Sequence, residues 1–169
     1  MTRLILLNGP PACGKSTIAR LFVERHPLAL TLDIDRIRDL IGGWRDQAGP
    51  AGLLARDIAL AAARTHLTSG YDVVVPQLLA RPQFIERAEA LAAELGCPFH
   101  EVVLMDGREN ALRRCAVRDG EVPAEIGAFY DRLVALMATR PAVRFVHSRE
   151  GEIEQTYQDF LAVLGGGLP

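Results

Sequence analysis

Short apolar runs alternate with longer amphipathic segments along the whole chain. The apolar runs predict five strands, at residues 3–8, 28–32, 71–76, 99–105 and 143–147. Segments with apolar residues every three or four positions predict helices at 15–25, 35–41, 51–69, 82–96, 107–118, 124–139 and 150–164. Residues 42–50 are rich in turn formers and are expected to form a loop. This alternation is typical of an α/β fold with a parallel sheet covered on both faces.

Composition is consistent with one domain spanning residues 1–169. Hydrophobic residues make up 49% and charged residues 24% of the chain, as in ordinary globular proteins. No apolar run reaches the ~18 residues of a membrane span, and the N-terminus lacks the pattern of a signal peptide. The three cysteines form no CxxC pair. We therefore expect a cytoplasmic protein without membrane contact.

The net charge of −2 argues against a large nucleic-acid surface, which usually needs a basic stripe. Lys and Arg together number 19, and Lys15 is the only lysine among them. A compact ammonium at this one position, where arginine serves everywhere else, indicates that a point charge is needed there.

That lysine lies in GPPACGKS, residues 9–16, which matches G-x-x-x-x-G-K-[ST] between a predicted strand and a predicted helix. Glycines permit the tight turn, and backbone amides from Ala12 onward can cradle phosphate oxygens, because Pro10 and Pro11 have no N–H. Lys15 would reach the β- and γ-phosphates of ATP, and the Ser16 hydroxyl would bind Mg²⁺. The expected ATP-binding residues of this segment are Gly9, Ala12, Cys13, Gly14, Lys15, Ser16 and Thr17.

The sequence offers little support for a GTPase or a hydrolytic ATPase. A base-reading N-K-x-D motif is excluded because the only lysine belongs to the phosphate loop. The run VVLMD ends in Asp106, but Gly107 follows where a water-activating glutamate would be expected. We favour Asp106 as a helix cap, and hydrolysis through Asp106 is the weakest alternative.

The segment DIDRIRD, residues 33–39, places carboxylates where they would face the phosphate loop. Asp35 could take the proton of an acceptor hydroxyl. Asp35 and Arg38 are three residues apart and share a helix face, so Arg38 could bind an anionic group of the acceptor. Asp33 is either a substrate contact or a helix N-cap.

GPPACGKSTIAR followed by DIDRIRDLI resembles the small P-loop phosphotransferases, especially polynucleotide 5′-hydroxyl kinases and, more loosely, chloramphenicol phosphotransferase, zeta-toxin kinases and gluconate kinase. The resemblance implies a nucleoside-monophosphate-kinase-like, three-layer P-loop NTPase fold. It also implies that Asp35 is the general base and that Arg38 contacts a substrate phosphate.

The resemblance extends to ALRRCAVR, residues 111–118, which is similar to the family's lid helix. It implies a short lid at about 113–124, in which Arg114 contacts ATP and Arg118 contacts the transferring phosphoryl group. Clustered arginines before a loop would suit a mobile lid that stabilises charge on the phosphate oxygens. Residues 147–152 lie where related kinases hold the adenine ring.

One position departs from the family. After the third predicted strand the family commonly carries aspartate, whereas this chain has Pro76 and Gln77. Gln77 can hydrogen-bond a hydroxyl but cannot act as a base, so the acceptor pocket differs. Trp44 and Arg81 are further candidates for acceptor contacts, by stacking on an aromatic or sugar group and by binding an anion, respectively.

The sequence therefore predicts an ATP- and Mg²⁺-dependent kinase that phosphorylates a hydroxyl of a small molecule, with Lys15, Asp35 and Arg118 as catalytic residues. A polynucleotide 5′-hydroxyl kinase and a nucleotide-binding regulator without transfer chemistry remain alternatives.

Overall fold

The computed structural model describes residues 2–120 and 124–165. Its five strands are β1 (Leu4–Asn8), β2 (Leu30–Thr31), β3 (Val73–Pro76), β4 (Phe99–Met105) and β5 (Arg144–His147). Its helices are α1 (Lys15–Arg25), α2 (Ile34–Asp39), α3 (Ala48–Thr68), α4 (Pro82–Leu95), α5 (Arg108–Asp119), α6 (Glu125–Ala138) and α7 (Ile153–Val163). The strands form one parallel sheet in the order β2-β3-β1-β4-β5. The predicted five-stranded α/β fold is confirmed.

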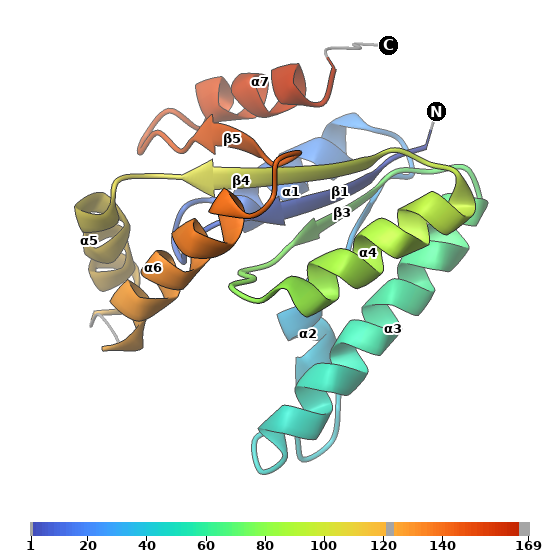
Figure 1. The fold of residues 1–169 in the computed structure, drawn as a ribbon, viewed down its shortest axis with the longest axis horizontal. Helices are drawn as coiled ribbons and strands as arrows, with labels where there is room; N and C mark the ends of the chain where they lie inside the picture. The colour runs from blue at the N-terminus through green and yellow to red at the C-terminus, as the bar shows by residue number, and fades with distance from the viewer. Residues whose placement is uncertain (1, 121–123, 166–169) are drawn as a thin grey trace.

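Helices cover both faces of the sheet (Figure 1). Side chains of α3, α4 and α6 pack with Leu4, Leu6, Val73 and Val75 in one core. Side chains of α1 and α7 pack with Ile5, Leu7, Val74 and Val102 in the other. The alternation of neighbouring strand residues between these cores explains why the strands read as continuous apolar runs.

Some element boundaries differ from the prediction. The expected loop at 42–50 is shorter, because α3 begins at Ala48 rather than at residue 51. The expected strand at 28–32 is reduced to Leu30–Thr31, because Leu28 has a left-handed backbone (φ 61°) that no strand accommodates. The last helix begins at Ile153 rather than at residue 150, after Gly151 with φ 78°. Residues 121–123 of the expected lid lie outside the described residues.

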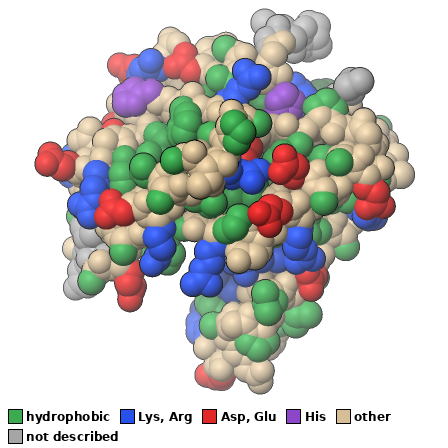
Figure 2. Space-filling view, in the orientation of Figure 1, with side chains coloured by type: hydrophobic (Ala, Val, Ile, Leu, Met, Phe, Trp, Pro, Cys, Tyr) green, Lys and Arg blue, Asp and Glu red, His purple; other side chains and the backbone are tan. Residues whose placement is uncertain are grey.

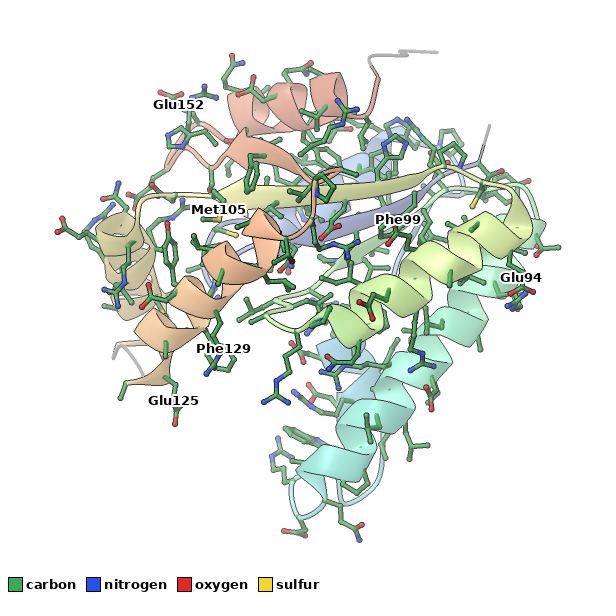
Figure 3. The ribbon with its side chains drawn as sticks, in the orientation of Figure 1. Glu94, Phe99, Met105, Glu125, Phe129 and Glu152 are labelled. Atoms are coloured by element: carbon green, nitrogen blue, oxygen red, sulfur yellow. The ribbon has the colours of Figure 1, made fainter. Side chains whose placement is uncertain are left out.

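The carboxyl edge of the sheet is where β1, β3 and β4 lead into the phosphate loop, residues 77–81 and α5. In Figure 3, Phe99 and Met105 mark the amino and carboxyl ends of β4, and α5 lies beyond Met105. Figure 2 shows the surface hollowed between the lobe that contains the start of α3 and the lobe of α5 and α6, with Lys or Arg side chains along its border. Phe129 projects from α6 away from the sheet (Figure 3).

Among the described residues, no helix combines the length and the apolar character needed to cross a membrane.

Candidate functional site

The phosphate loop connects β1 to α1, and its glycines are required by geometry. A Cβ on Gly9 (φ 148°) would lie 2.4 Å from the Leu104 carbonyl oxygen and 2.8 Å from Cys13 Sγ. Gly14 adopts φ 91° as the N-cap of α1, and no side chain caps this helix. The first amides of α1 are therefore available to an anion, in line with the partial positive charge of a helix N-terminus.

Lys15 extends back over the loop. Its Nζ donates hydrogen bonds to the carbonyl oxygens of Gly9 at 2.9 Å and Pro10 at 2.7 Å. Burial lowers the pKa of Lys15 below its ordinary value, and the nearby charge of Arg118 lowers it further, whereas Cys13 and Asp35 raise it. The ammonium is thus already placed at the loop where the β- and γ-phosphates of a nucleotide would lie.

A cavity of about 430 Å³ opens beside this loop. It is lined by Ala12, Gly14, Lys15, Ser16, Thr17, Arg114, Val117, Arg118 and Glu150. The structure therefore brings the predicted arginines of α5 to the phosphate loop, from a hundred residues away in sequence. Val117 and Glu150 were not predicted individually, although Val117 lies in the predicted lid helix 111–118 and Glu150 in the segment 147–152 after the last strand.

Arg114 is anchored at the side of this cavity. Its Nη1 donates to Ser148 Oγ at 2.8 Å and forms a salt bridge with Asp106 Oδ2 at 3.2 Å. Ser148 Oγ in turn donates to the Cys13 carbonyl oxygen at 2.6 Å. Ser148, which sequence reasoning missed, thus connects the segment after β5 with the phosphate loop and with α5.

Asp106 fulfils a structural role at the start of α5. Its Oδ1 accepts a hydrogen bond from the Gly107 amide at 2.7 Å. Burial raises the pKa of Asp106, but hydrogen bonds from Gly107, Asn110 and Arg114 outweigh burial and hold the pKa below its ordinary value. These donors engage its carboxylate, but the predicted helix-cap role of Asp106 is wrong: Gly107 is the N-cap of α5, and no side chain caps this helix.

Arg118 lies on the last turn of α5 and lines the cavity with an exposed side chain. Its Nε and Nη2 donate to the carboxylate of Asp119 at 2.7 and 2.6 Å. The predicted role of Arg118 in a lid stays a prediction.

Asp33 caps α2: its Oδ1 accepts from the amides of Asp35 at 3.0 Å and Arg36 at 3.2 Å. This is the N-cap role that the sequence left open. Asp33 also lines a second cavity of about 460 Å³, on the α1 side of the sheet edge. That cavity is lined by Ser16, Thr17, Arg20, Thr31, Leu32, Asp33, Arg36, Ile37, Leu40 and Pro76.

Asp35 and Arg38 share one side of α2, as their spacing predicts. Asp35 Oδ1 lies 3.1 Å from Arg38 Nη1, and the Asp35 side chain is 56% exposed. The guanidinium of Arg38 lies 4.3 Å from the ring centroid of Trp44, and that of Arg45 lies 4.6 Å from it. Cation–π contacts of this kind hold Arg38 beside the carboxylate.

The segment after β3 is joined to the phosphate loop by Asn8, another residue that sequence reasoning missed. Asn8 is fully buried, and its Nδ2 donates to the Leu79 carbonyl at 2.8 Å while its Oδ1 accepts from the Leu79 amide at 2.9 Å. The Gln77 amide donates to the Leu7 carbonyl at 3.0 Å. Gln77 is half-buried, whereas Arg81, the N-cap of α4, is exposed.

A magnesium ion would find a suitable donor at Ser16. No group of three or more His, Cys, Asp or Glu side chains able to hold a metal occurs among the described residues. Mg²⁺ needs no such cage in phosphoryl-transfer sites, because water and substrate phosphates supply most of its ligands. The exposed Ser16 hydroxyl lies at the start of α1, between the two cavities, and therefore fits this role.

The parallel sheet, the glycine-bounded loop and the lysine at the start of α1 define a P-loop nucleotide-binding protein of the small kinase fold. The chain belongs to the family described as AAA domain, whose model matches residues 4–129. No similar sequence is found among curated proteins. The prediction of a small P-loop kinase is confirmed at the level of family and fold.

Solved structures share this fold at low sequence identity. The tunicamycin resistance protein of Deinococcus radiodurans superposes with a TM-score of 0.73 at 21% identity, covering 99% of this chain and 98% of that one. A gluconokinase from Sinorhizobium meliloti 1021 superposes with a TM-score of 0.64 at 17% identity, covering 95% of this chain and 90% of that one. A protein from Chloroflexus aurantiacus j-10-fl superposes with a TM-score of 0.71 at 19% identity, covering 99% of this chain and 98% of that one.

Proposed function

We propose that the protein is an ATP- and Mg²⁺-dependent kinase that transfers the γ-phosphoryl group to a hydroxyl of a small molecule. The observation that carries the proposal is the convergence of Lys15, Ser16 and Arg118 on one cavity, with the Asp35 carboxylate close enough to influence the pKa of Lys15. The gluconokinase, which shares the fold, is named for phosphorylating a small hydroxylated molecule, and this is consistent with the proposal.

In the proposed reaction the acceptor hydroxyl gives its proton to Asp35 as its oxygen forms a bond to the γ-phosphorus. The bond between that phosphorus and the β–γ bridging oxygen breaks, and ADP leaves. Lys15 and the amides of the loop neutralise the phosphate oxygens, and Arg118 approaches the transferring group from α5. Bound Mg²⁺, held by Ser16, would supply additional positive charge at the phosphates.

Asp35 is suited to the role of base because it is exposed and its partner Arg38 is fixed by other contacts. Asp33 is less suited, since its Oδ1 already accepts two amide hydrogen bonds that hold the start of α2. We therefore assign Asp33 to the structure of the site and Asp35 to proton transfer.

The test is the Asp35→Asn variant, with Asp46→Asn as the control for loss of an exposed carboxylate between α2 and α3. Acceptor-stimulated ADP release should fall by about 10²–10⁴-fold in Asp35→Asn, the usual contribution of a positioned base. ATP binding measured by calorimetry should be retained. Full acceptor-dependent turnover in Asp35→Asn would refute the assignment.

Two alternative functions give different results in the same assay. A nucleotide-binding regulator would bind ATP, yet none of a broad panel of hydroxylated compounds would stimulate ADP release. A polynucleotide kinase would label 5′-hydroxyl oligonucleotides with an affinity that falls steeply with salt. The net charge of −2 favours the small-molecule acceptor.

A further inference from the structure

The carboxylate of Asp119 holds the guanidinium of Arg118 in a geometry that helical spacing does not provide. Neighbouring residues of a helix point to different sides, so their side chains do not ordinarily meet. Here Arg118 Nε donates to Asp119 Oδ1 at 2.7 Å, and Arg118 Nη2 donates to Asp119 Oδ2 at 2.6 Å. The guanidinium therefore turns toward the next residue of the chain and forms a bidentate pair with it.

Stabilisation of α5 does not account for Asp119. The C-terminal end of a helix carries a partial negative charge, so a carboxylate in the last turn is unfavourable, and Asp119 is the last residue of α5. The exposed fractions of the Arg118 and Asp119 side chains are 54% and 41%, and ion pairs exposed to this degree contribute little to stability. The role of the contact is therefore sought in its effect on Arg118.

A second side chain fixes Asp119 from the preceding turn of α5. Cys115 is buried, and its Sγ donates to Asp119 Oδ2 at 3.6 Å. Burial raises the pKa of the Cys115 thiol, and the Asp119 carboxylate raises it further, so the thiol keeps the proton that it shares with the carboxylate. Cys115, Asp119 and Arg118 thus form a chain of contacts from the buried side of α5 to the cavity.

The bidentate pair leaves one edge of the guanidinium available. Arginine has more N–H donors than one carboxylate can engage, and Asp119 uses only Nε and one hydrogen of Nη2. Within residues 2–120 and 124–165, Arg118 makes no hydrogen bond through Nη1. The edge formed by Nη1 and Nη2 has the fork geometry that matches phosphate oxygens. Arg118 can therefore contact a phosphoryl group while Asp119 stays in place.

Arg118 lines the cavity beside the phosphate loop together with Lys15 and Ser16. Its charge lowers the pKa of Lys15, so the guanidinium is close enough to act electrostatically on the ammonium. The carboxylate of Asp119 compensates the charge of Arg118 and reduces the repulsion between the two cations. The pair thus keeps Arg118 beside Lys15, which is where the γ-phosphate of a nucleotide would lie.

We propose that Asp119 is a positioning residue for phosphoryl transfer, which holds the Arg118 guanidinium so that its Nη1–Nη2 edge faces the transferring group. Asp119 itself contacts neither the nucleotide nor the acceptor. The inference rests on the proposed function, because it concerns Arg118 in that reaction. A donor that is already oriented stabilises the transition state without reorienting as the reaction proceeds, and a misplacement of about 1 Å can cost about 10²-fold in rate.

The first experiment compares Asp119→Asn with Asp131→Asn in the ADP-release assay. Asp131 is the matched control, because it accepts from Nε and Nη2 of Arg108 in an equally exposed pair, yet neither of these residues lines the cavity. With an acceptor that stimulates turnover, Asp119→Asn should lower kcat by about 10–100-fold and leave the KM for ATP nearly unchanged. Asp131→Asn should change kcat by less than about twofold.

Thermal unfolding distinguishes positioning from a structural role. The melting temperature of Asp119→Asn should stay within about 2 °C of the wild type, because an exposed pair is lost and an unfavourable charge at the helix end is removed. A loss of kcat that comes with a larger loss of stability would make Asp119 structural and overturn the inference. An unchanged or higher kcat would also overturn it, since Asp119 would then be dispensable or would restrain Arg118.

A double variant tests whether Asp119 acts through Arg118. Arg118→Ala alone should lower kcat by about 10³-fold or more. Adding Asp119→Asn to Arg118→Ala should change kcat by less than about twofold, because no guanidinium remains to be positioned. A further loss as large as in the wild-type background would show that Asp119 acts on another group and would overturn the inference.

A third measurement needs no acceptor and separates this inference from the proposed function. ADP with Mg²⁺ and aluminium fluoride imitates the transferring phosphoryl group, and transition-state analogues bind more tightly than substrates. The affinity for this mixture, measured by calorimetry, should be about 10–100-fold lower in Asp119→Asn than in Asp131→Asn, with the affinity for ADP alone unchanged. Equal affinities in the two variants would overturn the inference even for an active kinase. If no compound of the panel stimulates ADP release, the kinase proposal fails, and this comparison still decides the role of Asp119.

Discussion

Ser148 connects three parts of the site, and its removal tests whether the phosphate loop depends on the segment after β5. The side chain is almost fully buried. It donates to the Cys13 carbonyl at 2.6 Å and accepts from Arg114 Nη1 at 2.8 Å. Ser148→Ala would leave one loop carbonyl and one guanidinium N–H without these partners.

The expected loss of stability follows from the two bonds. A neutral hydrogen bond contributes about 1 kcal/mol and one to a charged group about 1.5–3 kcal/mol. The Asp106 carboxylate, which lies 3.2 Å from Arg114 Nη1, continues to pair with the guanidinium and moderates the second loss. We therefore expect a destabilisation of about 2–4 kcal/mol, or a decrease in melting temperature of about 5–15 °C.

The assay is thermal unfolding with and without ATP. The control is Ser69→Ala, because the Ser69 hydroxyl is exposed and donates only to the Thr65 carbonyl at the end of α3. The control should change stability by less than about 0.5 kcal/mol. ATP should also stabilise Ser148→Ala less than the wild type, since a less ordered loop binds it more weakly. Equal melting temperatures for Ser148→Ala and Ser69→Ala would refute the reasoning.

Two further predictions concern the loop backbone and a surface ion pair. Gly9→Ala should abolish ATP binding measured by calorimetry, because the added Cβ would lie 2.4 Å from the Leu104 carbonyl oxygen. The control is Gly49→Ala, which adds a Cβ in open space on α3 and should bind ATP normally. Retained ATP binding in Gly9→Ala would contradict the geometry of the loop. The hydrogen bonds from Arg25 and Gln158 lower the pKa of Glu154 to about 2 from an ordinary value of 4.5. Because the folded pKa is the lower one, the stability from ionised Glu154 is present above about pH 4.5 and is lost as pH falls toward 2. The melting temperatures of wild type and Glu154→Gln should therefore differ at pH 7 and converge near pH 2, and a difference that persists at pH 2 would show that its origin is not this ionisation.

Much of the fold is encoded locally. The spacing of apolar residues predicted all strands and helices in their correct order, and P-loop chemistry followed from GPPACGKS, because a loop that surrounds phosphate needs glycine and lysine at fixed intervals. The boundary at α3 was missed because AGPAG, residues 48–52, resembles a turn. Tertiary packing buries Ala51 and Ala55 and draws this segment into the helix.

The candidate site was predictable only where one segment supplies several residues. Lys15 and Ser16 come from a single motif, and the contact of Asp35 with Arg38 follows from helical spacing. The contacts of Ser148 with Cys13 and of Asn8 with Leu79 join residues 135 and 71 positions apart. Serine and asparagine at these positions carry no sequence signal, because their importance arises from burial beside unpaired backbone groups.

The sequence by itself therefore determined the order of elements, the phosphate loop and the residues of α2 that face it, since each depends on spacing within a few turns of chain. The tertiary structure decided that Arg114 is anchored by Ser148 and Asp106 whereas Arg118 is exposed. The burial and the contacts of a side chain depend on which distant segments pack against it and exclude water. Only the folded packing at the edge of the sheet decides which segments these are.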